Sequence, residues 1–233
     1  IGHSAYTFEF LCSSLKYKNA GEDSLTGMDF AVKRGETVGI IGGTGSGKSS
    51  LVNMIPRFYD ATAGEVLIGG RDVKSFEIPE LRERIGIVPQ KAVLFKGSIR
   101  DNMRWGKDDA TDDEILAAAK TAQAADVIES KGGLDFEIEQ GGKNLSGGQR
   151  QRFTIARALV RKPEILILDD SASALDFATD AALRRSIREM DTNPTVFIVS
   201  QRTSSIPHAD KIIVLDDGKI AGIGKHDELL NNC

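Results

Sequence analysis

The run GGTGSGKS at residues 42–49 constrains the fold of this chain more than any other part of its sequence. It satisfies the pattern G-x-x-x-x-G-K-[ST], in which a glycine-rich loop turns its backbone N–H groups inward and binds phosphate. The apolar residues 37–41 predict a strand before the loop, and residues 49–55 predict a helix after it. A glycine-rich turn without a ligand is the alternative, but the full pattern in this context favours a phosphate site in an α/β fold.

The phosphate loop supplies a first set of candidate ligand residues. Lys48 is expected to reach the β and γ phosphates of a nucleotide, and the hydroxyl of Ser49 is expected to bind Mg²⁺. The N-terminus of the following helix adds partial positive charge. The residues predicted to bind the cofactor in this loop are Gly42, Gly43, Thr44, Gly45, Ser46, Gly47, Lys48 and Ser49.

A second acidic position supports the same site. The apolar run at residues 165–168 predicts a buried strand, and it ends in Asp169. A carboxylate at the carboxyl end of such a strand is expected beside the phosphate loop, where it can hold hydrated Mg²⁺. Taken alone, Asp169 could equally be a turn aspartate after a buried strand, and it is the upstream phosphate loop that favours a metal role.

The order of the predicted elements indicates one domain with an inserted lobe. Residues 7–32 predict two strands joined by a turn, and residues 91–160 carry apolar side chains at helical spacing. Strand-like runs then alternate with helices. We therefore predict an α/β fold with a P-loop NTPase (RecA-like) core and a mostly parallel sheet. An N-terminal antiparallel β-subdomain and an inserted α-helical lobe complete it, with the core at 1–90 and 161–233 and the lobe at 91–160, all within one domain at 1–233.

Composition narrows the classes of function. The formal net charge is -4, which gives no general attraction to nucleic acid. Cys12 and Cys233 show neither metal-ligand spacing nor a disulfide framework, which fits a reducing, cytosolic setting. The apolar runs are far shorter than the ~20 residues that cross a bilayer. Because the chain starts with isoleucine and shows no signal-peptide pattern, we expect that it was excised from a longer polypeptide.

The pentapeptide LSGGQ at residues 145–149 is more specific than the phosphate loop. Ser146 and the glycines after it are placed to open a helix, so that a hydroxyl, bare N–H groups and the helix dipole can face a γ-phosphate. An ordinary capped helix is the alternative. Because of this pentapeptide the chain resembles the ATP-binding cassette (ABC) family. The pentapeptide distinguishes that family from other P-loop NTPases. The implied ligand residues are Leu145, Ser146, Gly147, Gly148 and Gln149.

The resemblance covers nearly the whole chain and implies further roles. Tyr17 matches the aromatic residue that stacks on adenine, although a strand tyrosine packed on the core is the other interpretation. Ser50 matches a further phosphate contact, and Gln90 matches the glutamine that touches both the metal and the transmembrane coupling helix. Asp176 belongs to SALD at 173–176, which resembles the loop that communicates across the dimer.

The resemblance also implies partners and a place in the cell. Residues 93–102 look like exporter cassettes, in which this lobe meets the transmembrane domains, and this favours an exporter over an importer. The expected cofactors are ATP and Mg²⁺. The expected partners are a second ABC cassette and the transmembrane domains of an exporter, with no nucleic acid, at the cytoplasmic face of the membrane.

Two positions depart from the family pattern. Asp170 stands where a glutamate normally orients or deprotonates the attacking water, and Gln201 stands where a histidine is expected. A carboxylate retracted by about 1 Å can lose on the order of 10²-fold in rate, and glutamine cannot become a cation. Lys48, Asp170 and Gln201 are therefore the candidate catalytic residues of a weakened site, which resembles the degenerate subunit of a heterodimeric bacterial multidrug exporter. Drift in a site that still hydrolyses ATP is the alternative.

Smaller observations leave other functions open or disfavour them. His3, His208 and His226 lie outside the expected histidine position and are interpreted as solvated or turn residues. The segment EQGGK at 139–143 replaces the more usual acidic-arginine-glycine segment of exporters. A DNA-maintenance ATPase of the same superfamily would need a long coiled-coil insertion, which this sequence lacks. A translation factor with two cassettes in one chain would need a second set of motifs, and the sequence has one set. A non-hydrolytic nucleotide-gated regulator and a fully active homodimeric exporter cassette stay open.

Overall fold

The computed structural model describes residues 6–18, 20–171, 173–201, 206 and 208–232. The chain divides into two compact units, one formed by residues 1–85 with 195–233 and the other by residues 86–194. Each is described by itself. The predicted division into a core and a helical lobe at residues 91–160 stays a prediction.

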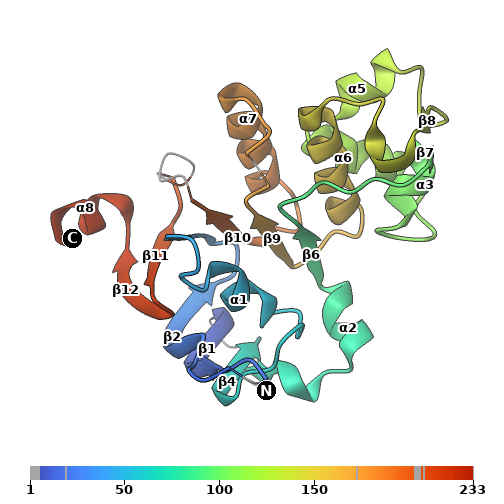
Figure 1. The fold of residues 1–233 in the computed structure, drawn as a ribbon. Helices are drawn as coiled ribbons and strands as arrows, with labels where there is room; N and C mark the ends of the chain where they lie inside the picture. The colour runs from blue at the N-terminus through green and yellow to red at the C-terminus, as the bar shows by residue number, and fades with distance from the viewer. Residues whose placement is uncertain (1–5, 19, 172, 202–205, 207, 233) are drawn as a thin grey trace. The chain divides into compact units, whose positions relative to one another are not determined.

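The first unit begins with an antiparallel sheet in the order β2-β1-β4-β5. Its strands are β1 (Tyr6–Leu15), β2 (Leu25–Lys33), β4 (Ala63–Ile68) and β5 (Arg71–Asp72). From Met28 onward alternate residues of β2 are buried, as expected for a strand with one face on a core. Phe10 of β1 stacks on Phe30 of β2 with ring centroids 4.6 Å apart. This sheet is the predicted N-terminal β-subdomain (Figure 1).

The same unit holds the strands that position the phosphate loop. β3 (Thr37–Gly42) lies between β10 (Thr195–Ser200) and β11 (Lys211–Asp216) and is parallel to both. β12 (Lys219–Gly224) is antiparallel to β11. Every residue of β10 is buried, as expected for a parallel strand covered on both faces. The remaining elements are α1 (Lys48–Asn53), the 3₁₀ turn η1 (Val73–Ser75), α2 (Ile78–Glu83) and α8 (His226–Asn232).

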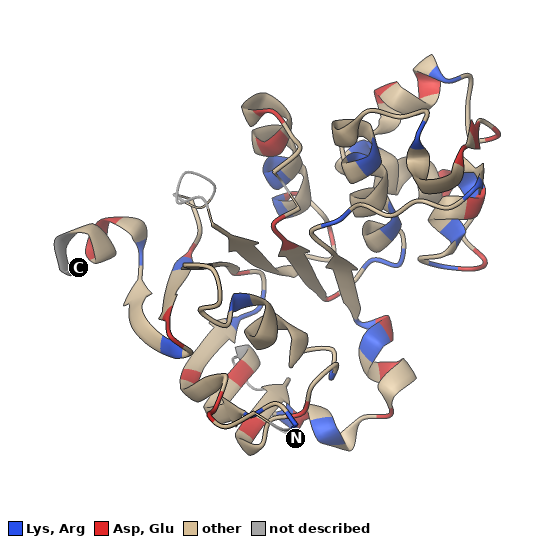
Figure 2. Ribbon diagram, viewed as in Figure 1, with Lys and Arg blue, Asp and Glu red and all other residues tan. Residues whose placement is uncertain are grey.

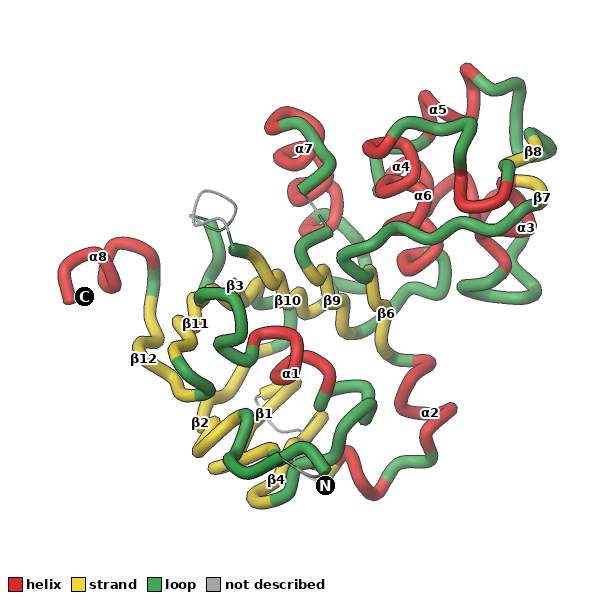
Figure 3. Tube along the Cα trace, viewed as in Figure 1, coloured by secondary structure: helices red, strands yellow, loops and turns green. Residues whose placement is uncertain are grey.

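The second unit is mainly helical. Its helices are α3 (Ile99–Arg104), α4 (Asp112–Thr121), α5 (Ala125–Ser130), α6 (Gly147–Leu159) and α7 (Phe177–Arg188). Its strands β6 (Ile85–Val88) and β9 (Ile165–Asp169) are neighbours in one sheet, and β7 (Gly97–Ser98) pairs with β8 (Glu137–Ile138). The 3₁₀ turn η2 (Gln140–Gly142) precedes α6. Figure 3 shows that helices and loops, rather than strands, make up most of the chain between β6 and β9.

Charge is distributed over the helices and loops of both units. Residues of both signs occur on α2, α3 and α7, whereas β6 and β10 carry none (Figure 2). No helix in the described part of the chain has the length and apolarity needed to cross a bilayer.

Candidate nucleotide-binding site

The phosphate loop joins β3 to α1 and depends on glycine at two close approaches. Gly47 is the N-cap of α1 with φ of 100°, in the left-handed region that favours glycine. A Cβ atom on Gly47 would lie 2.6 Å from Cδ2 of Leu25, and one on Gly42 would lie 2.4 Å from Oγ of Ser46. The loop conformation is therefore closed to larger residues at both positions.

Lys48 and Ser46 give the loop its capacity to hold an anion. The Lys48 side chain is buried, and its Nζ donates to the carbonyl oxygens of Gly42 at 2.7 Å and Gly43 at 2.8 Å. Within the described residues it has no carboxylate partner. The buried Oγ of Ser46 likewise lacks a hydrogen-bond partner there. A buried cation beside an orphaned hydroxyl fits a phosphate group, because each then gains the partner that burial demands.

Tyr17 lies close to the helix that leaves the phosphate loop. Its Oη is 2.5 Å from Oγ of Ser50, a residue of α1, and either atom can be the donor. The structure therefore brings together two residues predicted from the resemblance to contact adenine and phosphate. Tyr17 is half-buried rather than packed in the strand core.

The acidic positions of the second unit lie at the end of β9. Asp169 is the last residue of that strand, and Asp170 follows it with φ of 47°, in the left-handed region. Nε2 of Gln90 donates to Oδ2 of Asp170 at 3.3 Å. Two residues far apart in the sequence, both predicted to belong to the site, are thus hydrogen-bonded to each other.

The signature residues open helix α6 through reciprocal hydrogen bonds. Oγ of Ser146 accepts from the backbone N–H of Gln149 at 3.1 Å, and Oε1 of Gln149 accepts from the N–H of Ser146 at 3.0 Å. This capping box was the alternative interpretation of the motif, and it is present. It leaves the hydroxyl hydrogen of Ser146 available to donate, so the cap and a phosphate contact are compatible.

The glycines and the leucine of the signature differ in their surroundings. Leu145 is buried, whereas Ser146 and Gly147 are exposed. A Cβ atom on Gly148 would lie 3.2 Å from the carbonyl oxygen of Ala174. The start of α6 therefore runs close to the loop that precedes α7, and glycine at this position keeps that approach open.

Asp176 is the N-cap of α7. Its Oδ1 accepts from the backbone N–H of Thr179 at 2.8 Å, and its Oδ2 accepts from Oγ1 of Thr179 at 3.0 Å. The backbone hydrogen bond is the main cause of a lowered pKa of the Asp176 carboxyl. The bond therefore contributes stability above the ordinary pKa of an aspartate and loses it as the pH falls through the lowered pKa.

The hydrogen bonds described above do not include Gln201, His208 or His226. Gln201 is exposed and follows β10 directly. His208 is exposed, and His226 is the first residue of α8, 3.5 Å from a carboxylate oxygen of Asp227. His3 lies outside the described residues, so its predicted role as a solvated residue has no structural description.

The candidate site residues are shared between the two units. Tyr17, the phosphate loop, Ser50 and Gln201 belong to the first, and Gln90, the signature, Asp169, Asp170 and Asp176 belong to the second. Ser49, Gln90 and Asp169 offer a hydroxyl, an amide and a carboxylate, the oxygen ligands that suit Mg²⁺. That they share one ion, and that Asp169 lies beside the phosphate loop, stay predictions.

Tyr59 is not among the site residues predicted from the sequence. The ring of Tyr59 meets that of Tyr17 edge to face, with centroids 4.8 Å apart and an interplanar angle of 83°. The signal that could have found it is the run RFYD at residues 57–60, where arginine and aspartate three residues apart bracket two aromatic side chains.

Comparisons with known proteins identify the family of this chain. Residues 25–173 match the family model described as "ABC transporter". YgaD of Bacillus subtilis (strain 168), named as a candidate multidrug export ATP-binding/permease protein, is 43% identical over 224 residues, 96% of this chain and 39% of that protein. The Mycobacterium tuberculosis (strain ATCC 25618 / H37Rv) protein named "Uncharacterized ABC transporter ATP-binding protein Rv1273c" is 43% identical over 223 residues, 95% of this chain and 38% of that protein.

A solved structure extends the likeness to three dimensions. The structure of a bacterial Atm1-family ABC exporter with ATP bound matches with a TM-score of 0.90 and 38% identity, over 97% of this chain and 40% of that one. The fold is that of a P-loop NTPase, as predicted. The chain belongs to the ABC transporter family and corresponds to the nucleotide-binding domain of an exporter, a domain that uses ATP with Mg²⁺. It spans about two fifths of the length of these relatives.

Proposed function

We propose that this chain is the ATP-driven part of an ABC exporter, which binds Mg-ATP at its phosphate loop and pairs head to tail with a second cassette. The observation that carries the proposal is the buried ammonium of Lys48, whose described partners are two carbonyl oxygens. A cation buried in this way gains most from a phosphate that approaches it. The ATP-bound exporter structure with the same fold supports the choice of ligand.

Each residue then has a distinct task toward the nucleotide. Lys48 exchanges carbonyl partners for phosphate oxygens, and the backbone N–H groups of residues 42–47 surround the phosphate chain. Ser49, Asp169 and Gln90 are the residues that would hold Mg²⁺, which neutralises phosphate charge when bound. Tyr17 supplies an aromatic face for the base. Ser50 can donate its hydroxyl hydrogen to phosphate while its Oγ accepts from Oη of Tyr17.

The site built on this phosphate loop is proposed to hydrolyse ATP slowly. Asp170 is one methylene shorter than the expected glutamate, and its Oδ2 already accepts from Gln90. Gln201 can hydrogen-bond a phosphate but cannot bring a positive charge to it. Two hydrolysis positions are thus weakened, while binding positions match the family pattern. A non-hydrolytic regulator and a fully active homodimer are the competing forms of the same proposal.

The second cassette is proposed to be a different subunit. In a head-to-tail pair the signature of this chain serves the nucleotide on the partner's phosphate loop. The Ser146 hydroxyl hydrogen and the N–H group of Gly147, an exposed residue in the first turn of α6, suit that role. A partner that carries the glutamate and histidine missing here would make the site served by Ser146 the faster of the two.

The transmembrane part of the exporter is proposed to dock on the second unit, with the chain at the cytosolic face of the membrane. Supporting observations lie in and just after residues 93–102, the region that resembles exporters. Trp105 is 66% exposed and stacks on Phe95 with ring centroids 4.7 Å apart. Asp101, Arg104, Trp105 and Asp108 line a hollow of about 300 Å³ there. An exposed aromatic ring beside a hollow is typical of protein interfaces.

Calorimetric titration with Mg-ATP tests nucleotide binding, on which the proposed hydrolysis and pairing with a second cassette depend. Lys48→Ala should weaken binding about 10- to 100-fold, because a charged hydrogen bond of this kind contributes roughly 1.5–3 kcal/mol. Lys120→Ala removes an exposed lysine from α4 and serves as the matched control, with unchanged affinity expected. Equal affinity of the wild-type chain and the Lys48→Ala variant would reject the proposal.

A further inference from the structure

The residue predicted to stack on the base does not stand alone. Tyr17 is bonded through its Oη to Ser50 at 2.5 Å, and its ring receives the ring of Tyr59 at 4.8 Å and 83°. The hydroxyl bond fixes one end of the Tyr17 side chain, and the edge-to-face contact restrains the rotation of its ring. Two independent contacts thus hold this aromatic side chain.

Tyr59 can do this because backbone and side-chain bonds hold its own segment. The backbone N–H groups of Phe58 and Tyr59 both donate to the carbonyl oxygen of Asn53, at 3.0 and 3.4 Å. Asn53 is the last residue of α1, the helix that carries Ser50. The segment that presents Tyr59 is therefore tied to the same helix that binds the Tyr17 hydroxyl.

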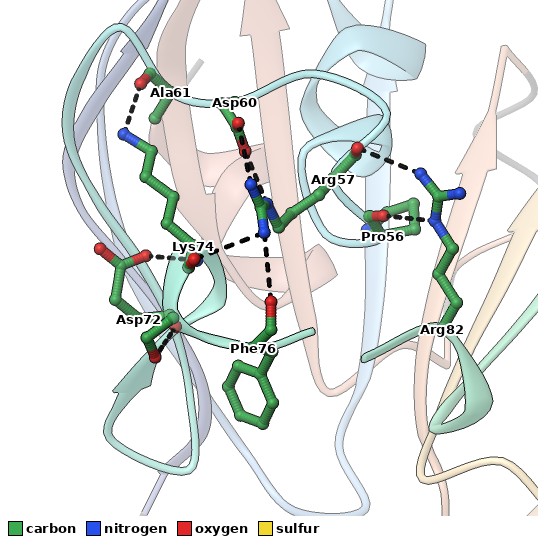
Figure 4. Close-up of polar contacts among 9 residues, drawn as sticks. Pro56, Arg57, Asp60, Ala61, Asp72, Lys74, Phe76 and Arg82 are labelled. Atoms are coloured by element: carbon green, nitrogen blue, oxygen red, sulfur yellow. Dashed lines mark hydrogen bonds and ion pairs between the residues drawn. The ribbon is translucent and has the colours of Figure 1, made fainter. Parts of the chain in front are cut away.

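Arg57 braces this segment from within, as Figure 4 shows. Its backbone has φ of 56°, in the left-handed region. Its guanidinium bonds both carboxylate oxygens of Asp60, at 2.9 and 3.2 Å, and the carbonyl oxygens of Phe76 at 3.3 Å and Lys74 at 3.4 Å. The Asp60 bond is the first cause of a raised pKa of the Arg57 guanidinium. The turn on either side of Tyr59 is thus closed by a two-point ion pair.

Two more cations hold the ends of the segment (Figure 4). Arg82 donates to the carbonyl oxygens of Pro56 at 3.0 Å and Arg57 at 3.3 Å, and Lys74 Nζ donates to that of Ala61 at 2.8 Å. Loops usually move more than the elements they connect, and these side-chain bonds to the backbone restrain this one. The bonds leave Tyr59 41% exposed and yet fixed in position.

We propose that Tyr59 is a positioning residue for nucleotide binding, which holds the ring of Tyr17 ready to stack on the base of ATP. The proposal rests on the proposed function, because it assumes that Tyr17 receives the base. Its physical basis is preorganisation: a ring already restrained loses less freedom when a ligand stacks on it. Tyr59 acts through Tyr17, so its contribution depends on the base and not on the phosphates.

Calorimetry with two ligands separates that role from a general effect on the loop. For Tyr59→Ala we expect Mg-ATP to bind about 2- to 10-fold more weakly, the range that an edge-to-face pair supports. Mg-tripolyphosphate, which has no base, should bind as it does to the wild-type chain. Tyr59→Phe keeps the ring and should restore Mg-ATP binding. Loss of affinity for both ligands would mean that Tyr59 only maintains the phosphate loop, and would overturn the proposal.

The neighbouring aromatic residue provides a matched control. Phe58 is 48% exposed on the same turn, and its ring lies under the Arg82 guanidinium at 4.8 Å rather than against Tyr17. Phe58→Ala should leave Mg-ATP affinity unchanged. If Phe58→Ala weakens binding as much as Tyr59→Ala does, the effect belongs to the turn and the positioning role is wrong.

A double-mutant cycle completes the test. In a Tyr17→Ala background the change Tyr59→Ala should have no further effect, because nothing is left to position. Additive losses would show that Tyr59 contacts the nucleotide by itself or serves another partner, and either result overturns the inference. If the wild-type chain fails to bind Mg-ATP at all while its fold is intact, the proposed function falls, and this inference falls with it.

Discussion

The phosphate loop and the two hydrolysis positions differ in how firmly the fold holds them. Lys48 is buried and makes two bonds shorter than 3 Å, inside a loop whose glycines admit no larger residue at positions 42 and 47. Asp170 has a 3.3 Å bond to Gln90, and Gln201 lies exposed after β10. The residues proposed to bind the nucleotide are therefore held by the packing, whereas the residues proposed for hydrolysis are held less firmly.

This difference explains how a cassette can lose one capacity and keep the other. A substitution at Gly47 has to displace Leu25, a residue of the core. Substitutions at positions 170 and 201 meet no comparable obstacle, because one residue is half-buried and the other exposed. A change at an exposed position such as 201 is usually within about 0.5 kcal/mol of neutral for stability. A weakened hydrolytic site is thus compatible with an intact binding site in the same chain.

The largest expected effect comes from placing a negative charge at the start of α6. Ser146→Asp keeps an N-cap of the favoured type but sets a carboxylate where a γ-phosphate is proposed to bind. We expect steady-state ATPase of the assembled transporter to fall about 10²- to 10³-fold, with little change in the unfolding midpoint. Ser146→Ala and Gly148→Asp should also lower turnover strongly.

Lys48→Ala in the same transporter is the control for that result. It alters the slow site, so it should cost less turnover than the Ser146 and Gly148 changes. Nucleotide occupancy is measured separately, so that lost binding is not taken for lost chemistry. If Lys48→Ala proves as inactive as Ser146→Asp while the partner site still binds ATP, the two sites contribute equally to turnover. The proposal of one slow and one fast site would then be wrong.

The next largest effect is expected from changing Asp170 and Gln201 to the residues that the family pattern has at these positions. Asp170→Glu adds the missing methylene, and Gln201→His adds a side chain that can become a cation. The pair should raise ATP turnover by about 10²-fold, and by more than either change alone if the positions act as a unit. Phosphate release by the purified chain and its variants is the measurement. Rapid hydrolysis by the wild-type chain would contradict a weakened site and favour the fully active homodimer.

Local signals in the sequence were enough to predict the elements that carry the site. The strand, glycine loop and helix around Lys48 are present, and Ser146 begins a helix as expected. The helix after the loop was predicted over residues 49–55, but α1 ends at Asn53. Met54 still has helical φ and ψ, and Pro56 disfavours the helical conformation in Ile55, the residue before it.

Pairings between distant segments were beyond those local signals. Gln90 and Asp170 are hydrogen-bonded although they lie far apart in the chain, and Tyr59 meets Tyr17 across the turn after α1. Neither contact changes the spacing of apolar residues in its own segment, so the local sequence does not predict it. The short strands β7 and β8 were missed for the same reason, because strands of this length have no period to detect.

The smallest expected effect distinguishes two roles of the first turn of α6, which are capping its own helix and contacting a γ-phosphate. Gln149→Ala removes the bond from the Ser146 N–H to Oε1 and leaves that exposed donor to water. The free energy of unfolding should fall by about 0.5–1 kcal/mol, the lower part of the range for lost helix caps, as measured by denaturant titration.

Gln149→Glu is the informative partner of that change. Glutamate keeps the capping box and favours the positive end of the helix, so stability should match or slightly exceed that of the wild-type chain. The added charge lies one turn from the proposed γ-phosphate contact of Ser146, so ATPase of the assembled transporter should nevertheless fall. If turnover followed stability in both variants, α6 would be only a capped helix. A stable but slow Gln149→Glu variant would instead mean that the first turn of α6 both closes its own backbone and faces a phosphate.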